Sequence, residues 1–154
     1  MLPKELADLL ETREFISVAT CDFDGHPSAA PKFILKREGN YIYLVDYVIG
    51  MTWKNLKANP QVSMSIVDTR TLKGYQLNGK VKIMSRGKLY NKMRKEMMDK
   101  EVRLTTQHII DEVRGHPTHD TFEILISEKF VIFEVKLEEV IEIDIHGELK
   151  RNKK

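Results

Sequence analysis

The sequence predicts a mainly β protein, an antiparallel barrel with helices attached at three points. Short runs rich in β-branched and aromatic residues recur along the chain, and turns containing glycine join several of them. The segments 62–66 and 141–145 alternate apolar and polar residues, which is the period of a strand with one buried face. About seven or eight such strands, mostly joined by short turns, favour closure into an antiparallel barrel.

The first part of the chain has the pattern of a helix followed by hairpins. Pro3 to Thr12 predicts an opening helix, because a proline stands at its start and its leucines fall on one face. The segments 22–25 and 37–40 each contain a glycine and predict tight turns. They separate three expected strands, at 15–20, 28–36 and 41–45.

The segment 50–60, GMTWKNLKANP, predicts a short helix whose beginning can hold an anion. Thr52 is expected to be the N-cap, because its hydroxyl can accept a hydrogen bond from a free backbone N–H of the first turn. The free N–H groups and the helix dipole favour a phosphate there, and Lys54 adds a positive charge. Pro60 ends the helix. An ordinary capped surface helix has the same pattern, so the flanking sequence must distinguish an anion site from such a helix.

The second part of the chain combines strands with a helical insert. A strand is expected at 75–84, with Gly79 as a candidate bulge. Residues 88–114 are rich in Met, Lys, Glu and Arg and lack proline, which predicts one or two helices ended by Gly115 and Pro117. Strands are expected again at 122–126, 130–136 and 141–145, before a frayed basic tail at 150–154.

Length and composition indicate one soluble globular domain over residues 1–154. The 25 basic and 23 acidic residues balance to +2 and form no basic stripe, which argues against a nucleic-acid partner. The chain has one cysteine, so no internal disulfide can form, as expected in a reducing compartment. No apolar run approaches the roughly 20 residues that cross a bilayer, and the charged N-terminal segment is unlike a signal peptide. We therefore expect a cytoplasmic protein.

The sequence indicates no catalytic residue and no metal site. His116 and His119 lie three positions apart, with Asp120 next to the second. Pro117 favours a polar loop rather than one helical face, and a third well-placed ligand is not evident, whereas structural zinc sites usually need four. Catalytic triads, paired carboxylates and nucleophile elbows are absent as well. Any chemistry must therefore come mainly from a cofactor.

Four segments occur in an order that resembles a known family. They are FISVATCDFDGHPSAAPKF, YIYLVDY, GMTWKNLKANPQVSMSI and KGYQLNGKV. In this order they are similar to the pyridoxamine 5′-phosphate oxidase-like, FMN-binding split-barrel superfamily, and most to its small flavin-binding and flavin reductase-type members. The resemblance covers about residues 1–85. The closing strands match it loosely, and the insert at about 88–115 carries none of its motifs.

The resemblance implies a split barrel that forms a homodimer, with two FMN molecules in grooves between the subunits. The second strand would pass the flavin ring and offer backbone groups to its polar edge, while the short helix would hold the phosphate. By role, the residues implied are Ala30, Pro31, Lys32 and Phe33 along the ring, Asp46 and Tyr47 near the ring or ribityl chain, Thr52, Lys54 and Asn55 around the phosphate, Trp53 as a stacking or packing residue, and Gln76 reaching the ring.

Several of these residues also have simpler explanations. Lys32 could be an outward-facing lysine on an edge strand, where Pro31 is tolerated too. Asp46 could only close a turn, and Gln76 could face solvent on an alternating strand.

The sequence departs from the family in two places. Many relatives carry a basic pair where this chain has Met51 and Thr52, so one phosphate cation is missing. Lys32, Lys54 or a lysine of the partner subunit could replace it. The C-terminal segment HGELKRNKK has no clear counterpart of the oxidase's substrate-phosphate residues, which argues against vitamin B6 oxidase activity.

The expected function is that of an FMN-dependent oxidoreductase, passing electrons from NADH or NADPH to an acceptor. One alternative is a non-enzymatic FMN-binding electron carrier. Another is a split barrel that binds deazaflavin or haem instead, or that has lost its ligand. For haem, His116 or His119 would be the first axial ligand to test.

Overall fold

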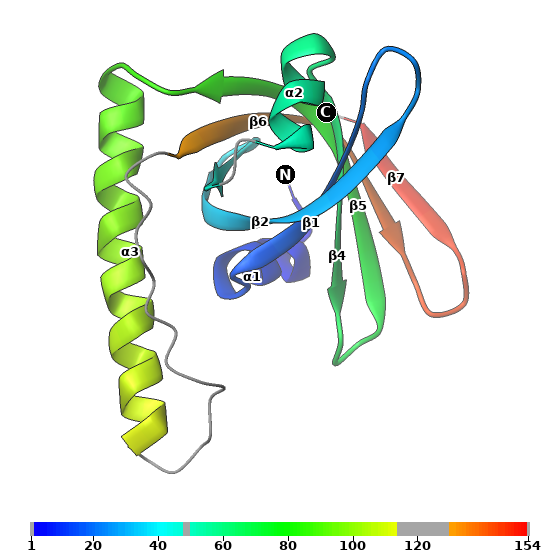
Figure 1. Cartoon of the computed structure of the whole chain (residues 1–154). Coiled ribbons are helices and arrows are strands. Elements are labelled where there is room, and N and C mark those ends of the chain that lie inside the picture. The colour runs from blue at the N-terminus through cyan, green and yellow to red at the C-terminus, as the bar shows by residue number, and fades with distance from the viewer. Residues whose placement is uncertain (1, 48–49, 114–129, 154) are drawn as a thin grey trace.

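The computed structural model describes residues 2–47, 50–113 and 130–153. Within these residues it contains three helices and seven strands (Figure 1). All strand pairings are antiparallel, in the order β3-β2-β1-β4-β5-β6-β7, and a further pairing of β3 with β6 closes the first six strands into a barrel. The predicted fold class is therefore confirmed. The strands are β1 (Phe15–Cys21), β2 (Pro27–Glu38), β3 (Tyr41–Asp46), β4 (Gln61–Asp68), β5 (Lys73–Met84), β6 (Val131–Ile143) and β7 (Leu149–Lys153).

The C-terminal part of the barrel differs from the prediction. Strand β6 is continuous where two strands were expected. The sequence pattern breaks within it because Glu138 is an extra residue in the pairing and shifts the alternation of buried and exposed residues by one position. The basic tail is not frayed but forms β7 against the second half of β6. A turn held by Asp144, which accepts backbone N–H groups from His146 and Glu148, reverses the chain before β7. The predicted strand 122–126 and the predicted helix end at Gly115 and Pro117 lie outside the described residues.

The pairing is irregular at the predicted position, but the extra residue is Glu138 of β6 and Gly79 lies opposite it. An added Cβ would stand 2.3 Å from the backbone carbonyl oxygen of Lys136. Gly79→Ala is therefore expected to destabilise the protein by about 1–3 kcal/mol, the usual range for overpacking. Urea unfolding would measure this. Gly74→Ala, in the same strand, is the control because its Cβ would make an ordinary 3.7 Å contact with Ile143. Equal losses for the two variants would contradict the steric explanation.

Two apolar clusters stabilise the barrel. The first fills its interior and includes Leu6, Leu9 and Leu10 of α1 (Lys4–Thr12), which begins just after Pro3 as predicted. The second lies outside the barrel, between its wall and α3 (Lys88–Val113), and includes Met93 and Met97. The insert is thus one long helix standing beside the barrel (Figure 1).

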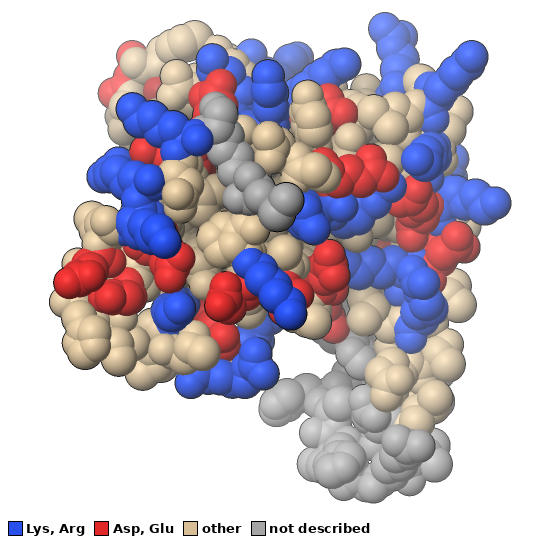
Figure 2. Space-filling model, turned by 180° about the vertical axis from the view of Figure 1, so that it is seen from behind, with Lys and Arg blue, Asp and Glu red and all other residues tan. Residues whose placement is uncertain are grey.

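The surface shows no concentration of one charge on the face drawn in Figure 2, where basic and acidic side chains are interspersed. Among the described residues, no helix combines the length and the apolar character needed to span a membrane.

Candidate cofactor pocket

A pocket of about 440 Å³ lies where the first half of β2, the end of β3 and the start of α2 (Met51–Ala58) meet. Small-molecule sites usually enclose about 300–1,000 Å³, so the volume suits a cofactor or substrate. Phe15, Val45, Gly50 and Met51 contribute to its walls. The pocket also brings together Ala30, Pro31, Lys32, Phe33, Asp46, Tyr47 and Thr52 from the residues predicted to surround FMN.

Lys32 and Asp46 form a buried ion pair in this pocket. Strands β2 and β3 pair Phe33 with Val45, so Lys32 and Asp46 come next to each other one position further along. The Lys32 ammonium donates to Asp46 Oδ1 at 2.8 Å, and the two side chains are 9% and 3% exposed. Because β2 lies between β1 and β3, Lys32 is not an edge-strand lysine. The pair is neutral overall, so Lys32 brings no net charge for a phosphate.

The first turn of α2 borders the same pocket. The helix begins at Met51 with Gly50 as its N-cap, so the prediction of Thr52 as N-cap is wrong. The reason is that the Gly50 carbonyl already accepts the Lys54 N–H, at 3.2 Å, which starts the helix before Thr52. Thr52 is buried within the first turn and still lines the pocket. The helix ends at Ala58, with Asn59 as its C-cap before Pro60, as predicted.

The other predicted residues of α2 lie outside the pocket lining. Asn55 is buried and donates to Thr20 Oγ1 at 3.2 Å, which ties the helix to β1. Trp53 packs on the barrel core, and the Lys57 ammonium lies 4.5 Å from the centre of its ring. Lys54 is exposed, one helical turn after Met51, which places it on the same side of α2 as that lining residue.

Gln76 is not brought to the pocket within one chain. It lies half-buried on β5, with Tyr75 and Leu77 on either side of it facing the barrel interior. Its amide nitrogen donates to Ser63 Oγ and Asn78 Oδ1, each at 3.2 Å. Gln76 is therefore on the outer face of the barrel, opposite Ser65 of β4.

Glu101 is a residue of this region that the sequence analysis missed. It lies on α3, is 3% exposed, and its Oε1 accepts a hydrogen bond from the Tyr47 hydroxyl. Burial, and then the neighbouring Glu101 carboxylate, raise the pKa of the Tyr47 phenol. Among the described residues, Glu101 Oε2 has no hydrogen-bond partner although it is buried. The sequence signal was an acidic residue one helical turn after the buried Met97, on the apolar side of α3.

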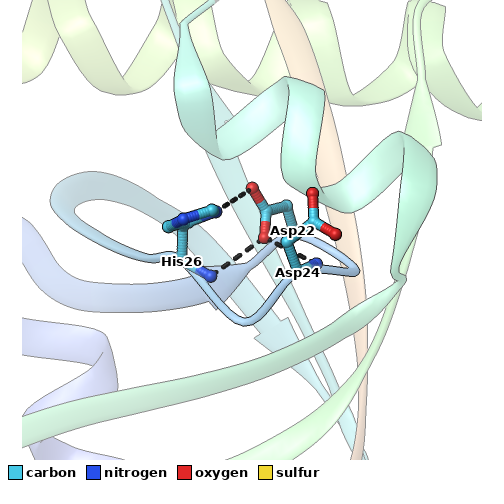
Figure 3. A group of neighbouring side chains, drawn as sticks. All are labelled: Asp22, Asp24 and His26. Carbon is cyan, nitrogen blue, oxygen red and sulfur yellow. Dashed lines mark hydrogen bonds and ion pairs between the residues drawn. The ribbon is translucent and has the colours of Figure 1, made fainter.

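Asp22, Asp24 and His26 form the tightest group of metal-type ligands in the described part of the chain (Figure 3). Asp22 Oδ1 accepts the backbone N–H groups of Asp24 and His26 at 3.0 and 2.9 Å, and Oδ2 lies 3.1 Å from His26 Nδ1. The backbone hydrogen bond from His26 is the largest cause of the lowered pKa of Asp22. These bonds are those of a hairpin turn, and we assign no metal to it. His116, His119 and Asp120 lie outside the described residues.

Solved structures similar to this one share its fold. A protein from Clostridium acetobutylicum, related to general stress protein 26 of B. subtilis and described as of the pyridoxinephosphate oxidase family, is 19% identical over 97% of this chain and 92% of its own, with a TM-score of 0.67. An F420 reductase is 19% identical over 90% of this chain and 98% of its own, with a TM-score of 0.59. A haem-binding protein from Mycobacterium smegmatis is 15% identical over 99% of this chain and 59% of its own, with a TM-score of 0.65.

At these identities the structural likeness shows the fold alone. No curated protein matches the sequence. The sequence profile of the family described as pyridoxamine 5'-phosphate oxidase, however, matches residues 2–144. Because this match spans most of the chain and agrees with the closed antiparallel barrel, the chain belongs to the pyridoxamine 5'-phosphate oxidase family.

Proposed function

We propose that this protein binds FMN in the pocket between β2, β3 and α2 and acts as an FMN-dependent oxidoreductase. The observation that carries the proposal is the pocket itself, about 440 Å³ in volume. It gathers residues of three separate segments that the family resemblance places around FMN, from β2, from the end of β3 and from the start of α2.

The lining fits the parts of FMN in different ways. Phe33 and Val45 give an apolar wall that suits the flat ring, and the backbone of Pro31 offers a polar group near its edge. The first turn of α2, with Thr52, suits the phosphate because free N–H groups and the helix dipole favour an anion. Since Lys32 is neutralised by Asp46, the exposed Lys54 or a cation of a second copy would balance the phosphate charge.

FMN would supply the hydride and electron transfer, and this chain would bind, orient and shield it. Lys32 and Asp46 would give the ring a fixed polar environment that is closed to water. Tyr47 is oriented by Glu101 on α3, so its hydroxyl is directed at that helix. None of these side chains is nominated as a general acid or base. NADH or NADPH is the proposed electron donor, on the family resemblance alone.

The outer face of the barrel supports a homodimer. Away from Glu38 and Gln61 at the strand ends, its exposed residues on β1, β2 and β4 are small or apolar, and Phe15 and Val67 are 55% and 51% exposed. Strand pairing sets Pro31, Ser17, Ser65 and Gln76 in one row across this face. A second copy covering it would bring Gln76 toward the flavin held by its partner, which explains why Gln76 lies outside the pocket of its own chain.

The proposal predicts that Thr52→Val combined with Lys54→Ala weakens FMN binding at least tenfold, because hydrogen bonds to charged groups contribute about 1.5–3 kcal/mol each. FMN affinity would be measured by titration of flavin fluorescence. Lys57→Ala is the matched control: that lysine lies on the same helix but stacks on Trp53. Unchanged affinity in the double variant would reject the phosphate site.

The visible spectrum of protein purified without added cofactor tests the ligand class. A flavin spectrum, with FMN released on denaturation, is the expected result. A haem or deazaflavin spectrum, or a colourless protein that takes up no FMN, would overturn it. Steady-state oxidation of NADH or NADPH with an added acceptor then separates an enzyme from an electron carrier.

A further inference from the structure

A second pocket, of about 370 Å³, lies at the second half of β2, where residues of α1 and α3 also line it. Each of these three elements contributes one leucine to it: Leu10 from α1, Leu35 from β2 and Leu104 from α3. The rest of the lining is charged, with four cations and one carboxylate. No residue lines both pockets.

Local structure explains how these groups converge. The pairing of β2 with β3 is irregular between Ile34 and Lys36, which makes Leu35 an extra residue. Leu35 and Lys36 therefore both turn toward α3, as shown by the packing of Leu35 in the cluster beside that helix and by the ion pair of Lys36 with Glu96. On α3, Lys100, Arg103 and Leu104 are spaced three and four positions apart and share one face.

The cations of this pocket are neutralised to different degrees. Lys36 lies 2.5 Å from Glu38 and 2.6 Å from Glu96, so its charge is balanced. Arg37 donates to the backbone carbonyl of Gly39 at 3.3 Å, and its ion pair is a long contact of 3.5 Å with Glu11, a side chain that is 64% exposed. Arg37 Nε is buried and has no hydrogen-bond partner among the described residues. One donor of this guanidinium is thus left without an acceptor.

Lys100 and Arg103 place two further positive charges on the α3 side of this pocket. The Lys100 ammonium donates to the backbone carbonyls of Ile34 and Leu35 at 2.6 and 3.2 Å and lies 5.0 Å from the centre of the Phe33 ring. These partners are neutral. Burial lowers the pKa of Lys100, and the charge of Arg103 lowers it further, whereas Glu14 opposes the shift. Lys100 is half-buried and Arg103 is exposed beside it, and an anion between two neighbouring cations is favoured because it relieves their repulsion.

We propose that this pocket binds a small amphipathic organic anion, with a carboxylate or phosphate head between Arg37, Lys100 and Arg103 and an apolar body on the three leucines. Arginine suits this head, because its planar guanidinium can donate two parallel hydrogen bonds to a carboxylate or phosphate. The volume is within the range of small-molecule sites. The proposal does not depend on FMN.

Isothermal titration with decanoate and with decanol, both below their aggregation limits, tests the site. These probes share the chain and differ in the charge of the head. Decanoate is expected to bind at least tenfold more tightly than decanol and to weaken as salt is raised. Decyl phosphate, titrated in parallel, tells which head is preferred.

Arg103→Gln is the decisive variant, since Arg103 is exposed and its replacement leaves the core untouched. It is expected to weaken decanoate binding about tenfold without changing decanol binding. Lys80→Gln, at an exposed ion pair on β5, is the control and should change neither. Equal affinity for the two probes, no binding of decanoate, or an effect of Lys80→Gln as large as that of Arg103→Gln would overturn the proposal. FMN binding by Arg103→Gln should equal that of the natural sequence. The proposal for this pocket and the proposal for the FMN pocket are therefore tested independently.

Discussion

Asp46→Ala is expected to destabilise the protein by about 3–5 kcal/mol, because it leaves the Lys32 ammonium buried without its carboxylate. Lys32→Met is expected to have an effect of the same size, since it leaves the Asp46 carboxylate buried. Both side chains are almost completely enclosed and lie 2.8 Å apart, so each charge depends on its partner. Urea unfolding at neutral pH gives the difference in the free energy of unfolding.

A surface pair provides the control for this prediction. Glu138 lies 3.3 Å from Lys80, and their side chains are 48% and 57% exposed. Glu138→Ala should therefore change stability by less than about 1 kcal/mol. The double variant Lys32→Met with Asp46→Leu should recover most of the loss, because apolar residues of similar volume often replace a buried pair without penalty. Single variants no worse than Glu138→Ala would show that the pair does not support the fold.

The same double variant separates stability from ligand binding. Lys32 and Asp46 are the charged residues of the described pocket lining, and their replacement leaves an apolar wall. If the pair contacts FMN as proposed, the double variant should fold well and bind FMN less tightly. Retained FMN affinity in a stable double variant would limit the pair to a structural role.

Tyr47→Phe is expected to destabilise the protein by about 1.5–3 kcal/mol, the range for a hydrogen bond to a charged group. The Tyr47 hydroxyl is the donor to the buried carboxylate of Glu101, and the phenylalanine variant removes it. Tyr90→Phe is the matched control, in the same apolar cluster. Its hydroxyl donates to the neutral carbonyl of Phe130 at 3.2 Å, so its loss should be about 1 kcal/mol. Equal effects of the two variants would mean that the charge of Glu101 adds nothing.

The contribution of Tyr47 should also depend on pH. Its pKa is raised in the folded protein, so the folded state keeps the phenol proton that an unfolded chain loses near pH 10. The stability that Tyr47 provides is therefore complete below about pH 10 and is lost as the pH rises above that value. The difference in unfolding free energy between the natural sequence and Tyr47→Phe should shrink between pH 9 and about pH 11. A constant difference would contradict this explanation.

The sequence predicted best what neighbouring residues decide among themselves. The hairpin strands and the helix before Pro60 follow from alternation, turn residues and proline, which act within a few positions. The start of α2 was placed wrongly because Thr52 has the chemistry of an N-cap, yet the Gly50 carbonyl begins the helix. The basic composition of the tail predicts a frayed end, whereas in the structure the tail pairs with the second half of β6.

By itself, the sequence determined the antiparallel barrel, its family resemblance and the three segments that meet at the first pocket. Only the tertiary structure decided that Lys32 pairs with Asp46, that Glu101 on a distant helix holds Tyr47, and that Lys100 and Arg103 face β2 across a second pocket. The physical reason is the range of the forces involved. Turn and strand preferences are local, whereas a buried charge takes its role from whichever partner the strand register and helix packing bring within a few ångströms.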